Sequence, residues 1–254
     1  MLIDRLQIVT NTEIAPGIYS MTIHMPEAAK NAHPGQFVMV YTGKGELLLP
    51  RPISICDADG EVLRLVYQVV GKGTEAMAQM QHGGYVKILA PLGKGFFLSP
   101  EAARTPLKSV ALVGGGIGTP PLLLLAKKLK AQGAYVDVYL GFRANPILTA
   151  EFKAIADNLH IATEDGSVGH KGNILEVLQQ KSQPYDEILA CGPRPMLGAL
   201  ANYAQSKGIL CQVSMEERMA CGLGTCVGCV LEISGTYLRI CTEGPVFYSD
   251  KINW

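Results

Sequence analysis

Apolar and polar residues alternate with a period of two through much of the first hundred residues. This pattern predicts five short strands separated by Pro and Gly, together with one short helix. Strands of this kind without long helices are typical of an antiparallel barrel or sandwich. The expected strands are RLQIVTN (5–11), IYSMTIHM (18–25), QFVMVYTG (36–43), EVLRLVYQVV (61–70) and YVKILAP (85–91), and the expected helix is TEAMAQM (74–80).

From residue 108 onward, short apolar strands alternate with longer segments of helical periodicity. Strand and helix in regular turn predict a parallel sheet with helices on both faces, so the fold class is β followed by α/β. The expected strands are 109–115, 134–141, 160–165, 186–192 and 210–215, and the expected helices are 120–132, 149–158, 173–180 and 195–208.

The two patterns meet at a polar, Pro-containing stretch, SPEAARTPLK (99–108), which is typical of a linker. We therefore expect a β-barrel domain over 1–102 and an α/β domain over 103–212. The remaining residues, 213–254, are too few for an independent domain and contain four of the seven Cys residues, so we expect a small C-terminal module there.

The composition narrows the possible partners and the compartment. Lys plus Arg and Asp plus Glu both number 22, so no excess of positive charge is available for nucleic acid or an anionic membrane surface. The N-terminus lacks the pattern of a signal peptide, and the longest apolar run, PPLLLLA, is too short to span a bilayer. We expect a cytoplasmic protein, in which clustered thiols act as metal ligands or redox groups more often than as disulfides.

The cysteines near the C-terminus have the spacing C-x4-C-x2-C-x11-C. A C-x4-C-x2-C run with a later fourth Cys is the plant-type pattern for a [2Fe-2S] cluster, and the glycines of the loop suit a chain that wraps a cluster. Structural zinc also takes four thiolates, so zinc and unliganded thiols remain alternatives. The gap of eleven residues indicates a compact module and not a whole ferredoxin domain. The expected metal ligands are Cys221, Cys226, Cys229 and Cys241.

A glycine-rich turn, GGGIGTPP (114–121), follows the first strand of the α/β region and opens a helix. Such a turn lets the backbone approach a pyrophosphate, and the helix N-terminus offers free N–H groups. CGPRPM (191–196) occupies a second strand-to-helix turn. Because ligands collect at the carboxyl ends of strands in open sheets, we expect both turns to line one crevice. The structural alternatives are a tight turn for packing and a buried core Cys191.

The barrel region offers two further polar segments, RPISI (51–55) and VYQVVGKGT (66–74). Arg51 suits a phosphate, and the GKGT turn leads into a helix. Taken alone, both segments read equally well as surface strand residues.

In this order and at these separations, RPIS, GKGT, GGGIGTPP, CGPRPM and MEERMACGLGTCVGC resemble the ferredoxin–NADP reductase superfamily. Within it, the chain is similar along its whole length to the electron-transfer subunits of NAD-dependent dihydroorotate dehydrogenases. The resemblance implies an FAD held by Arg51, Pro52, Ile53, Ser54, Val66, Tyr67, Gln68, Gly73 and Thr74. It implies NAD at Gly114, Gly115, Gly116, Gly118, Thr119, Cys191, Gly192 and Pro193.

Two positions refine this expectation. Relatives often have Arg where Gln68 stands, and Lys72 is a substitute contact for the FAD diphosphate. Glu164 and Asp165 follow the third strand of the α/β region, where NADP-specific relatives tend to carry a basic residue. Since a carboxylate suits a ribose hydroxyl and repels a 2′-phosphate, Asp165 favours NAD, although a solvated turn is the alternative.

The resemblance also implies a function in pyrimidine (UMP) biosynthesis. A partner subunit would oxidise dihydroorotate at an FMN, and electrons would pass through the [2Fe-2S] cluster and FAD to NAD. This chain would have no dihydroorotate site and no catalytic side chain of its own, and it would join the FMN subunit in a heterotetramer with two copies of each. The alternatives are a diaphorase-type subunit that serves a hydrogenase or ferredoxin, and a zinc-stabilised, nucleotide-binding regulatory protein.

Overall fold

The computed structural model describes residues 2–98, 107–181 and 184–254, and the chain forms two compact units. The first contains residues 1–95, 216–231 and 236–245, and the second contains 96–215, 232–235 and 246–254. The residues after 213 therefore contribute to both units. The expected boundary near residue 102 lies outside the described residues, and the division into three domains stays a prediction.

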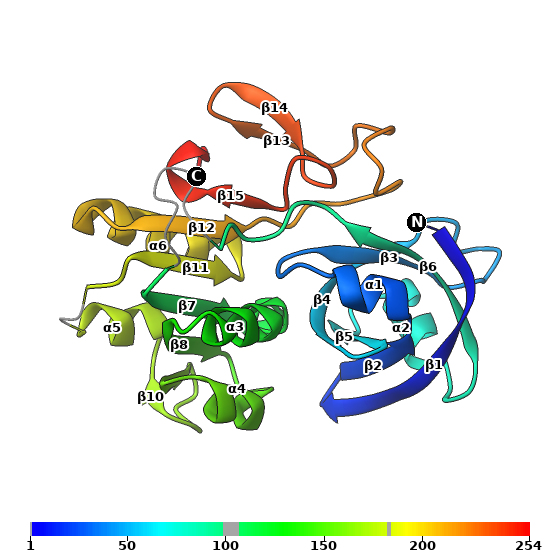
Figure 1. Cartoon of the computed structure of the whole chain (residues 1–254), viewed down its shortest axis with the longest axis horizontal. Coiled ribbons are helices and arrows are strands. Elements are labelled where there is room, and N and C mark those ends of the chain that lie inside the picture. Colours follow the sequence, from blue (N-terminus) through cyan, green and yellow to red (C-terminus); the bar gives the residue numbers. More distant parts are fainter. Residues whose placement is uncertain (1, 99–106, 182–183) are drawn as a thin grey trace. The chain divides into compact units, whose positions relative to one another are not determined.

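The first unit is built on a closed antiparallel barrel with the strand order β1-β2-β5-β4-β3-β6 (Figure 1). The five expected strands are present, and the barrel adds a sixth, β4. The elements are β1 (Leu2–Ala15), β2 (Ile18–His24), α1 (Pro26–Asn31), β3 (Phe37–Tyr41), β4 (Arg51–Asp59), β5 (Val62–Gln68), α2 (Lys72–Ala78) and β6 (Tyr85–Leu92).

Alternate residues of the barrel strands point inward and form its core. Met21 on β2 faces Leu65 on β5, and both are fully buried. Burial of such side chains stabilises the unit by about 2 kcal/mol each. Because β4 and β5 run antiparallel, the start of β4 and the end of β5 lie at the same end of the barrel. This pairing brings the segments that begin at Arg51 and end at Gln68 together.

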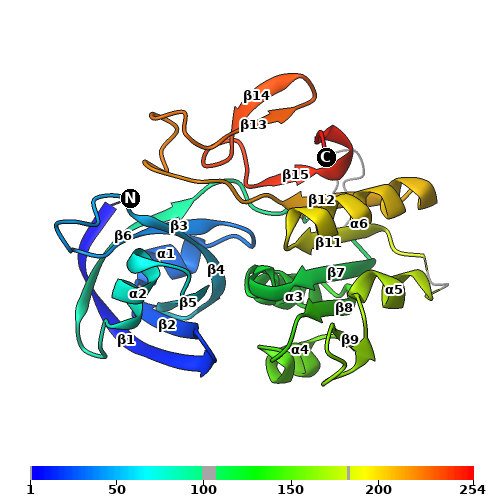
Figure 2. The ribbon, with the colours of Figure 1, turned by 180° about the vertical axis from the view of Figure 1, so that it is seen from behind.

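The second unit contains a sheet of seven strands in the order β10-β9-β8-β7-β11-β12-β15 (Figures 1 and 2). The predicted parallel sheet is confirmed, and β15 from the C-terminal residues adds an antiparallel edge beside β12. The strands are β7 (Ser109–Gly115), β8 (Tyr135–Phe142), β9 (Asn158–Thr163), β10 (His170–Lys171), β11 (Glu187–Cys191), β12 (Leu210–Ser214) and β15 (Val246–Tyr248).

Helices cover both faces of this sheet. A Cβ added to Gly114 would meet Leu122 of one helix, whereas a Cβ on Gly115 would meet Met196 of another. Since successive residues of a strand face opposite sides, α3 and α6 lie on opposite faces. The helices are α3 (Pro121–Ala131), α4 (Thr149–Ile155), α5 (Ile174–Gln179) and α6 (Arg194–Lys207).

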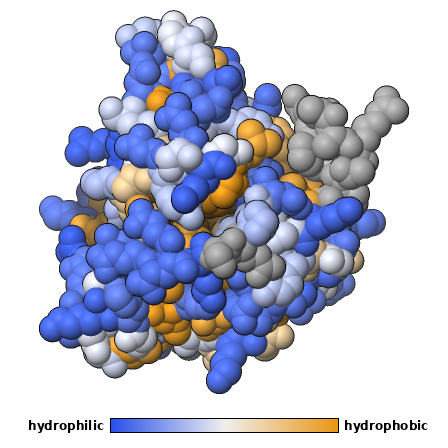
Figure 3. Space-filling view, turned by 90° about the vertical axis from the view of Figure 1, so that its left-hand side faces the viewer, coloured by the Kyte–Doolittle hydropathy of each residue, from blue (hydrophilic) through white to orange (hydrophobic). Residues whose placement is uncertain are grey.

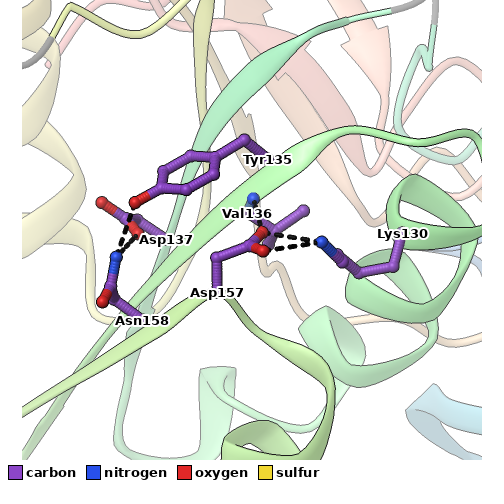
Figure 4. Close-up of polar contacts among 6 residues, drawn as sticks. All are labelled: Lys130, Tyr135, Val136, Asp137, Asp157 and Asn158. Atoms are coloured by element: carbon purple, nitrogen blue, oxygen red, sulfur yellow. Dashed lines mark hydrogen bonds and ion pairs between the residues drawn. The ribbon is translucent and has the colours of Figure 1, made fainter.

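A polar network ties the first residues of β8 and β9 to the end of α3 (Figure 4). The Asp157 carboxylate accepts hydrogen bonds from Lys130 Nζ and from the Val136 N–H, both at 2.7 Å. Asn158 Nδ2 donates to the Tyr135 hydroxyl at 2.6 Å and to Asp137 Oδ1 at 2.8 Å. Burial raises the pKa of Asp157, but the hydrogen bonds from Lys130 and Val136 outweigh it and leave the pKa below its ordinary value. The carboxylate is therefore a structural anchor of the sheet.

The C-terminal residues also form a small hairpin of β13 (Val230–Ile233) and β14 (Thr236–Arg239), drawn in orange in Figure 1. Its turn residues, Ser234 and Gly235, both have positive φ, as a tight hairpin turn of the primed type requires. No helix in the described part of the chain is long and apolar enough to cross a membrane. The face drawn by hydropathy in Figure 3 is largely hydrophilic, with hydrophobic residues showing in patches between.

Candidate cofactor sites and the cysteine loop

Arg51 and Gly73 meet at the end of the barrel where β4 begins. A Cβ added to Gly73 would lie 1.7 Å from Arg51 Nε, so the guanidinium rests directly on the glycine at the start of α2. Arg51 Nη1 donates to the carbonyls of Leu49 and Pro50, which holds the group in place. Among the described residues, Nε and Nη2 of Arg51 have no acceptor. The arrangement presents a fixed positive charge at the first turn of a helix.

Thr74 shapes the turn beside this charge. Its hydroxyl accepts from the Val70 N–H at 2.9 Å and donates to the Gly71 carbonyl at 3.0 Å. The first turn of a helix leaves its N–H groups without acceptors inside the helix, so Lys72 and Gly73 present theirs outward. A cation packed directly on a glycine, beside two backbone N–H groups, fits the diphosphate of a dinucleotide.

In the predicted segment Val66–Gln68, only Gln68 is exposed to solvent, and the side chains of Val66 and Tyr67 are buried. Tyr67 is buried, and its hydroxyl donates to Asn11 Oδ1 at 3.0 Å. Asn11 in turn donates to the carbonyls of Met77 and Met80, each at 2.9 Å, so this chain of bonds anchors the end of α2. Burial raises the pKa of Tyr67 to about 12. The structure thus gives the Tyr67 side chain a structural role, while Gln68 is exposed.

The remaining residues of the barrel segment lie next to Arg51 on β4. Pro52, Ile53 and Ser54 are each partly exposed, and Ser54 pairs with Phe37 across the ladder. Their contact with a flavin stays a prediction.

In the second unit, the two predicted turns lie directly against one another. Gly118 packs on Cys191 so closely that a Cβ would lie 2.5 Å from the Cys191 carbonyl oxygen. Gly114 and Cys191 are paired across the neighbouring strands β7 and β11, at the carboxyl edge of the sheet. The two segments therefore share one edge, as the sequence predicted.

The glycines of these turns have a packing role as well as a possible binding role. Gly192 lies against Met196 and Gly115, and Gly115 lies against Pro193. Gly116 differs from them, since its φ is +52° and a Cβ there would meet nothing within 4 Å. Thr119 is fully buried, and its hydroxyl has no hydrogen-bond partner among the described residues. The open backbone at Gly116 fits a nucleotide phosphate, whereas the Thr119 hydroxyl lies buried beside Gly114, where an added Cβ would be 3.0 Å from it.

Asp165 is exposed just beyond the end of β9. Its Oδ1 accepts from the Ser167 N–H at 2.9 Å and from the Ser167 hydroxyl at 2.7 Å. These bonds, first of all the backbone one, hold the pKa of Asp165 below its ordinary value. Asp165 is therefore a fixed anion beyond the carboxyl edge of the sheet, and its contact with a ribose stays a prediction.

The hairpin explains the eleven-residue gap between the third and fourth cysteines. Cys229 precedes β13 and Cys241 follows β14, so the two strands return the chain to its starting point. The Ile240 N–H donates to the Cys229 carbonyl at 2.9 Å and closes the base of the hairpin. The third and fourth cysteines thus lie close together although eleven residues separate them along the chain.

The four thiols lie near one another. The Cys226 thiol is among the groups that shift the pKa of Cys221, and the thiols of Cys229 and Cys221 are among those that shift the pKa of Cys241. Among the described residues, no three His, Cys, Asp or Glu side chains enclose a single metal ion. A [2Fe-2S] cluster is held by four thiolates on two irons, and four neighbouring thiols fit this group.

Backbone N–H groups of the loop point at the sulfurs. Leu223 N lies 3.3 Å and Cys226 N lies 3.5 Å from Cys221 Sγ. Burial raises the pKa of Cys221, but these hydrogen bonds and that of the Cys226 thiol outweigh it and lower the pKa to about 6. Burial and the Cys229 thiol raise the pKa of Cys241 to about 12. The loop favours a thiolate at its first cysteine before any metal is added.

The backbone of the loop is left-handed at three positions. Gly222 has φ +71° and packs on Met39 of β3, where a Cβ would lie 2.6 Å from Met39 Cγ. Gly224 has φ +80° and Val227 has φ +57°. Positive φ is unusual for a β-branched residue, so Val227 is a strained position next to a cysteine ligand.

Sequence reasoning missed two charged residues that support the loop, Arg239 and Glu243. They form an ion pair at 2.7 Å, and Arg239 Nη1 also donates to the Gly224 carbonyl at 3.2 Å. The sequence could have predicted this ion pair, because the two residues carry opposite charges, are four positions apart and flank Cys241.

Comparison with known proteins identifies the chain's relatives. A family model described as the iron-sulfur cluster binding domain of dihydroorotate dehydrogenase B matches residues 216–253. The electron transfer subunit of dihydroorotate dehydrogenase B (NAD(+)) from Shouchella clausii is 42% identical over 253 residues, which cover 96% of this chain and 95% of the relative. The same subunit from Caldanaerobacter subterraneus subsp. tengcongensis is 38% identical over 252 residues, with coverage of 98% and 97%.

A solved structure is also similar over nearly the whole chain. It belongs to a study of flavin-based electron bifurcation by the NADH-dependent reduced ferredoxin-NADP oxidoreductase. The TM-score is 0.88 at 30% sequence identity, and the match covers 98% of this chain and 90% of that one.

A closed barrel, a parallel sheet with glycine turns at its carboxyl edge and a four-thiol loop together define an iron–sulfur reductase with the ferredoxin–NADP reductase fold. The family model assigns the cysteine loop to an iron–sulfur site, so the zinc alternative is not supported. The chain belongs to the family of electron transfer subunits of NAD-dependent dihydroorotate dehydrogenase B.

Proposed function

We propose that this chain is the electron-transfer subunit of an NAD-dependent dihydroorotate dehydrogenase, with FAD and a [2Fe-2S] cluster as cofactors. The observation that carries the proposal is the near-full-length identity of 38–42% to subunits of that name, combined with the four cysteines inside the matched iron–sulfur domain. When bound, FAD exchanges a hydride with nicotinamide and single electrons with a cluster, so the two cofactors join two-electron to one-electron transfer.

In the first unit, the chain's own residues bind and orient the flavin nucleotide. Arg51 and the N–H groups of Lys72 and Gly73 hold the diphosphate, and Thr74 keeps their turn in place. Ser54 and the adjoining residues of β4 line the ring side of the site. The support is the contact between Arg51 and Gly73, which places the guanidinium directly beside the first N–H groups of α2 and leaves no room for a side chain at position 73.

In the second unit, the glycine turn 114–119 and the turn 191–193 bind NAD at the carboxyl edge of the sheet. The open backbone at Gly116 faces the phosphates, while Asp165 accepts from a ribose hydroxyl. A fixed carboxylate there disfavours a 2′-phosphate and supports NAD over NADP.

The partner is an FMN-containing catalytic subunit that oxidises dihydroorotate, and we place the complex in the cytoplasm, where thiols stay reduced. Apolar side chains around the cysteine loop support contact with another protein. Leu223 and Val227, on either side of Cys226, are 57% and 59% exposed, and Tyr237 on β14 is 72% exposed. We further propose two copies of each subunit, as the family resemblance implies.

A second candidate changes the partner and keeps the chemistry. The 30% identity to a chain of the NADH-dependent reduced ferredoxin-NADP oxidoreductase study favours a subunit that serves a ferredoxin or another redox enzyme. Co-purification distinguishes the two, because each candidate requires a different catalytic subunit.

The test uses the full chain expressed with and without the dihydroorotate-oxidising subunit encoded by the same genome. The purified complex should reduce NAD with dihydroorotate, and light scattering should give its stoichiometry. The chain alone, loaded with FAD and iron–sulfur cluster, should oxidise NADH with an artificial acceptor. Absence of NADH oxidation by the loaded chain, or zinc without sulfide on metal analysis, would refute the proposal.

The contact surface is tested by Val227→Asn and Leu223→Ser. Asn tolerates the positive φ at position 227, so Val227→Asn removes apolar surface without adding backbone strain. Both variants should keep their iron and sulfide and bind the partner subunit several-fold more weakly. Lys30→Gln on α1, far along the chain from the loop, serves as the control.

A further inference from the structure

We propose that Arg239 is a positioning residue for the cysteine loop and that its fixed positive charge raises the reduction potential of the cluster. This inference rests on the proposed function, because it assumes that the four thiols hold a [2Fe-2S] cluster. Nothing in the sequence motif assigns a role to Arg239, which lies at the end of β14, two residues before Cys241.

The first step is the way in which Arg239 is held. Its Nε and Nη2 donate to the two oxygens of Glu243 at 3.2 and 2.7 Å, so the ion pair is bidentate. The Arg239 backbone N–H and the Thr242 hydroxyl both donate to Glu243 Oε2 at 2.8 Å. This pattern fixes the plane of the guanidinium, as paired donors on a carboxylate do.

The second step is the contact between the fixed guanidinium and the loop. Arg239 Nη1 donates to the Gly224 carbonyl at 3.2 Å. Gly224 lies in the loop between Cys221 and Cys226, so this bond ties the guanidinium to the loop that carries the first two thiols. Its φ of +80° and the approach of Thr242, only 2.8 Å from an added Cβ, exclude other residues at this point.

The third step is electrostatic. Arg239 stands two residues before Cys241, and its Nη1 lies 3.2 Å from the Gly224 carbonyl, so the guanidinium lies beside the loop that carries the thiols. Glu243 partly neutralises this charge through the bidentate ion pair, so its loss would leave the positive charge of Arg239 uncompensated beside the loop. Hydrogen bonds and net charge around the sulfurs are known determinants of cluster potentials, and a nearby cation favours the more negative, reduced state.

A purely mechanical role makes a different prediction from an electrostatic one. If Arg239 and Glu243 only brace the loop, loss of either partner should loosen the loop in the same way. If the charge matters, Arg239→Gln removes a positive charge and Glu243→Gln removes a negative one, so the two variants should move the potential in opposite directions.

The experiment is an EPR-monitored redox titration of the full-length protein loaded with FAD and cluster, with iron and sulfide measured in each sample. We expect a lower cluster midpoint potential in Arg239→Gln and a higher one in Glu243→Gln. Arg239→Lys keeps the charge and should restore the potential, while its cluster should be lost faster on dilution because the bond to Gly224 is weakened. Lys30→Gln and Glu61→Gln, which change the same charges on exposed residues of the barrel unit, should leave the potential unchanged.

Shifts of both variants in one direction, or no shift in Glu243→Gln, would overturn the inference. Glu243→Gln decides the matter if Arg239→Gln cannot retain its cluster. The proposed function fails separately, if the wild-type protein shows no reducible [2Fe-2S] signal after reconstitution.

Discussion

The side-chain amide of Gln212 pairs with both backbone groups of Phe97. Gln212 Oε1 accepts from the Phe97 N–H and Nε2 donates to the Phe97 carbonyl, each at 2.9 Å. Nε2 also donates to Glu187 Oε1 at 2.9 Å, and all atoms of the Gln212 and Glu187 residues are inaccessible to solvent. Glu187 thereby fixes the orientation of the amide that anchors the segment entering the second unit.

Glu187→Gln should stabilise the protein at high pH. Burial raises the pKa of Glu187 to about 7, which the hydrogen bond from Gln212 opposes and the Asp186 carboxylate reinforces. Since the unfolded chain releases this proton at its ordinary pKa near 4.5, the protonated form stabilises the fold fully below that value and the benefit is lost as the pH rises to 7. The substitution removes that loss, worth on the order of 2 kcal/mol.

Thermal unfolding at pH 5 and pH 8 measures the effect. The gain in Tm of Glu187→Gln over wild type should be larger at pH 8 than at pH 5, while exposed Glu46→Gln should show no such difference. An equal Tm difference at both pH values would show that Glu187 is ionised in the native state throughout.

Gly118→Ala should disrupt the nucleotide edge of the second unit. The new Cβ would lie 2.5 Å from the Cys191 carbonyl oxygen, and two backbone segments cannot yield as a flexible side chain does. We expect at least tenfold weaker NADH binding, about 1.4 kcal/mol or more, together with a lower Tm. Gly45→Ala is the matched control, because a Cβ there meets nothing within 4 Å. Unchanged NADH affinity in a fluorescence titration of Gly118→Ala would contradict the proposed site.

Gly73→Ala should reduce FAD retention. A methyl group at this position occupies the place of the Arg51 guanidinium, which must swing away from the start of α2. The protein should purify with several-fold less FAD and recover it only at higher FAD concentration, while the barrel keeps its far-UV circular dichroism. Arg51→Gln should behave in the same way without the steric change. Full FAD occupancy in both variants would place the diphosphate elsewhere.

The sequence predicted the strands and helices that have a clear hydrophobic period, and also strands buried on both faces such as β7 and β11, because short apolar runs between helices indicate a parallel sheet. Of β4, only the first residues, RPISI, were offered as strand residues. The rest was not predicted because Ile55, Cys56 and Asp57 are buried in succession, which conceals the period of two, and α1 packs against this strand. The shared edge of residues 114–119 and 191–193 was predictable, because it follows from parallel topology alone. The position of β15 at the edge of the sheet was not predictable, because it depends on the C-terminal residues folding back beside β12.

The iron–sulfur site was predictable because its four cysteines lie close together in the sequence. Only turns and one hairpin connect them, so their spacing alone indicates a cluster site. For Tyr67 the contact with FAD, which the resemblance implies, stays a prediction, while the structure shows that its hydroxyl donates to Asn11. The contact of Arg239 with Gly224 requires the hairpin to fold back, and local sequence gives no measure of that approach.

Asp165→Asn should relax the preference for NAD over NADP. The amide oxygen can still accept from Ser167, so the turn is kept, whereas the negative charge that opposes a 2′-phosphate is lost. We expect the ratio of kcat/KM for NADH to that for NADPH to fall about tenfold, which corresponds to ~1.4 kcal/mol, mostly through a lower KM for NADPH. Glu176→Gln on α5 is the control, because it removes the negative charge of another exposed carboxylate. That carboxylate already has a partner within the protein, since Glu176 Oε2 lies 2.8 Å from His170 Nε2. If Asp165→Asn leaves the ratio unchanged while Glu164→Gln lowers it, the neighbouring carboxylate faces the ribose and Asp165 only shapes the turn.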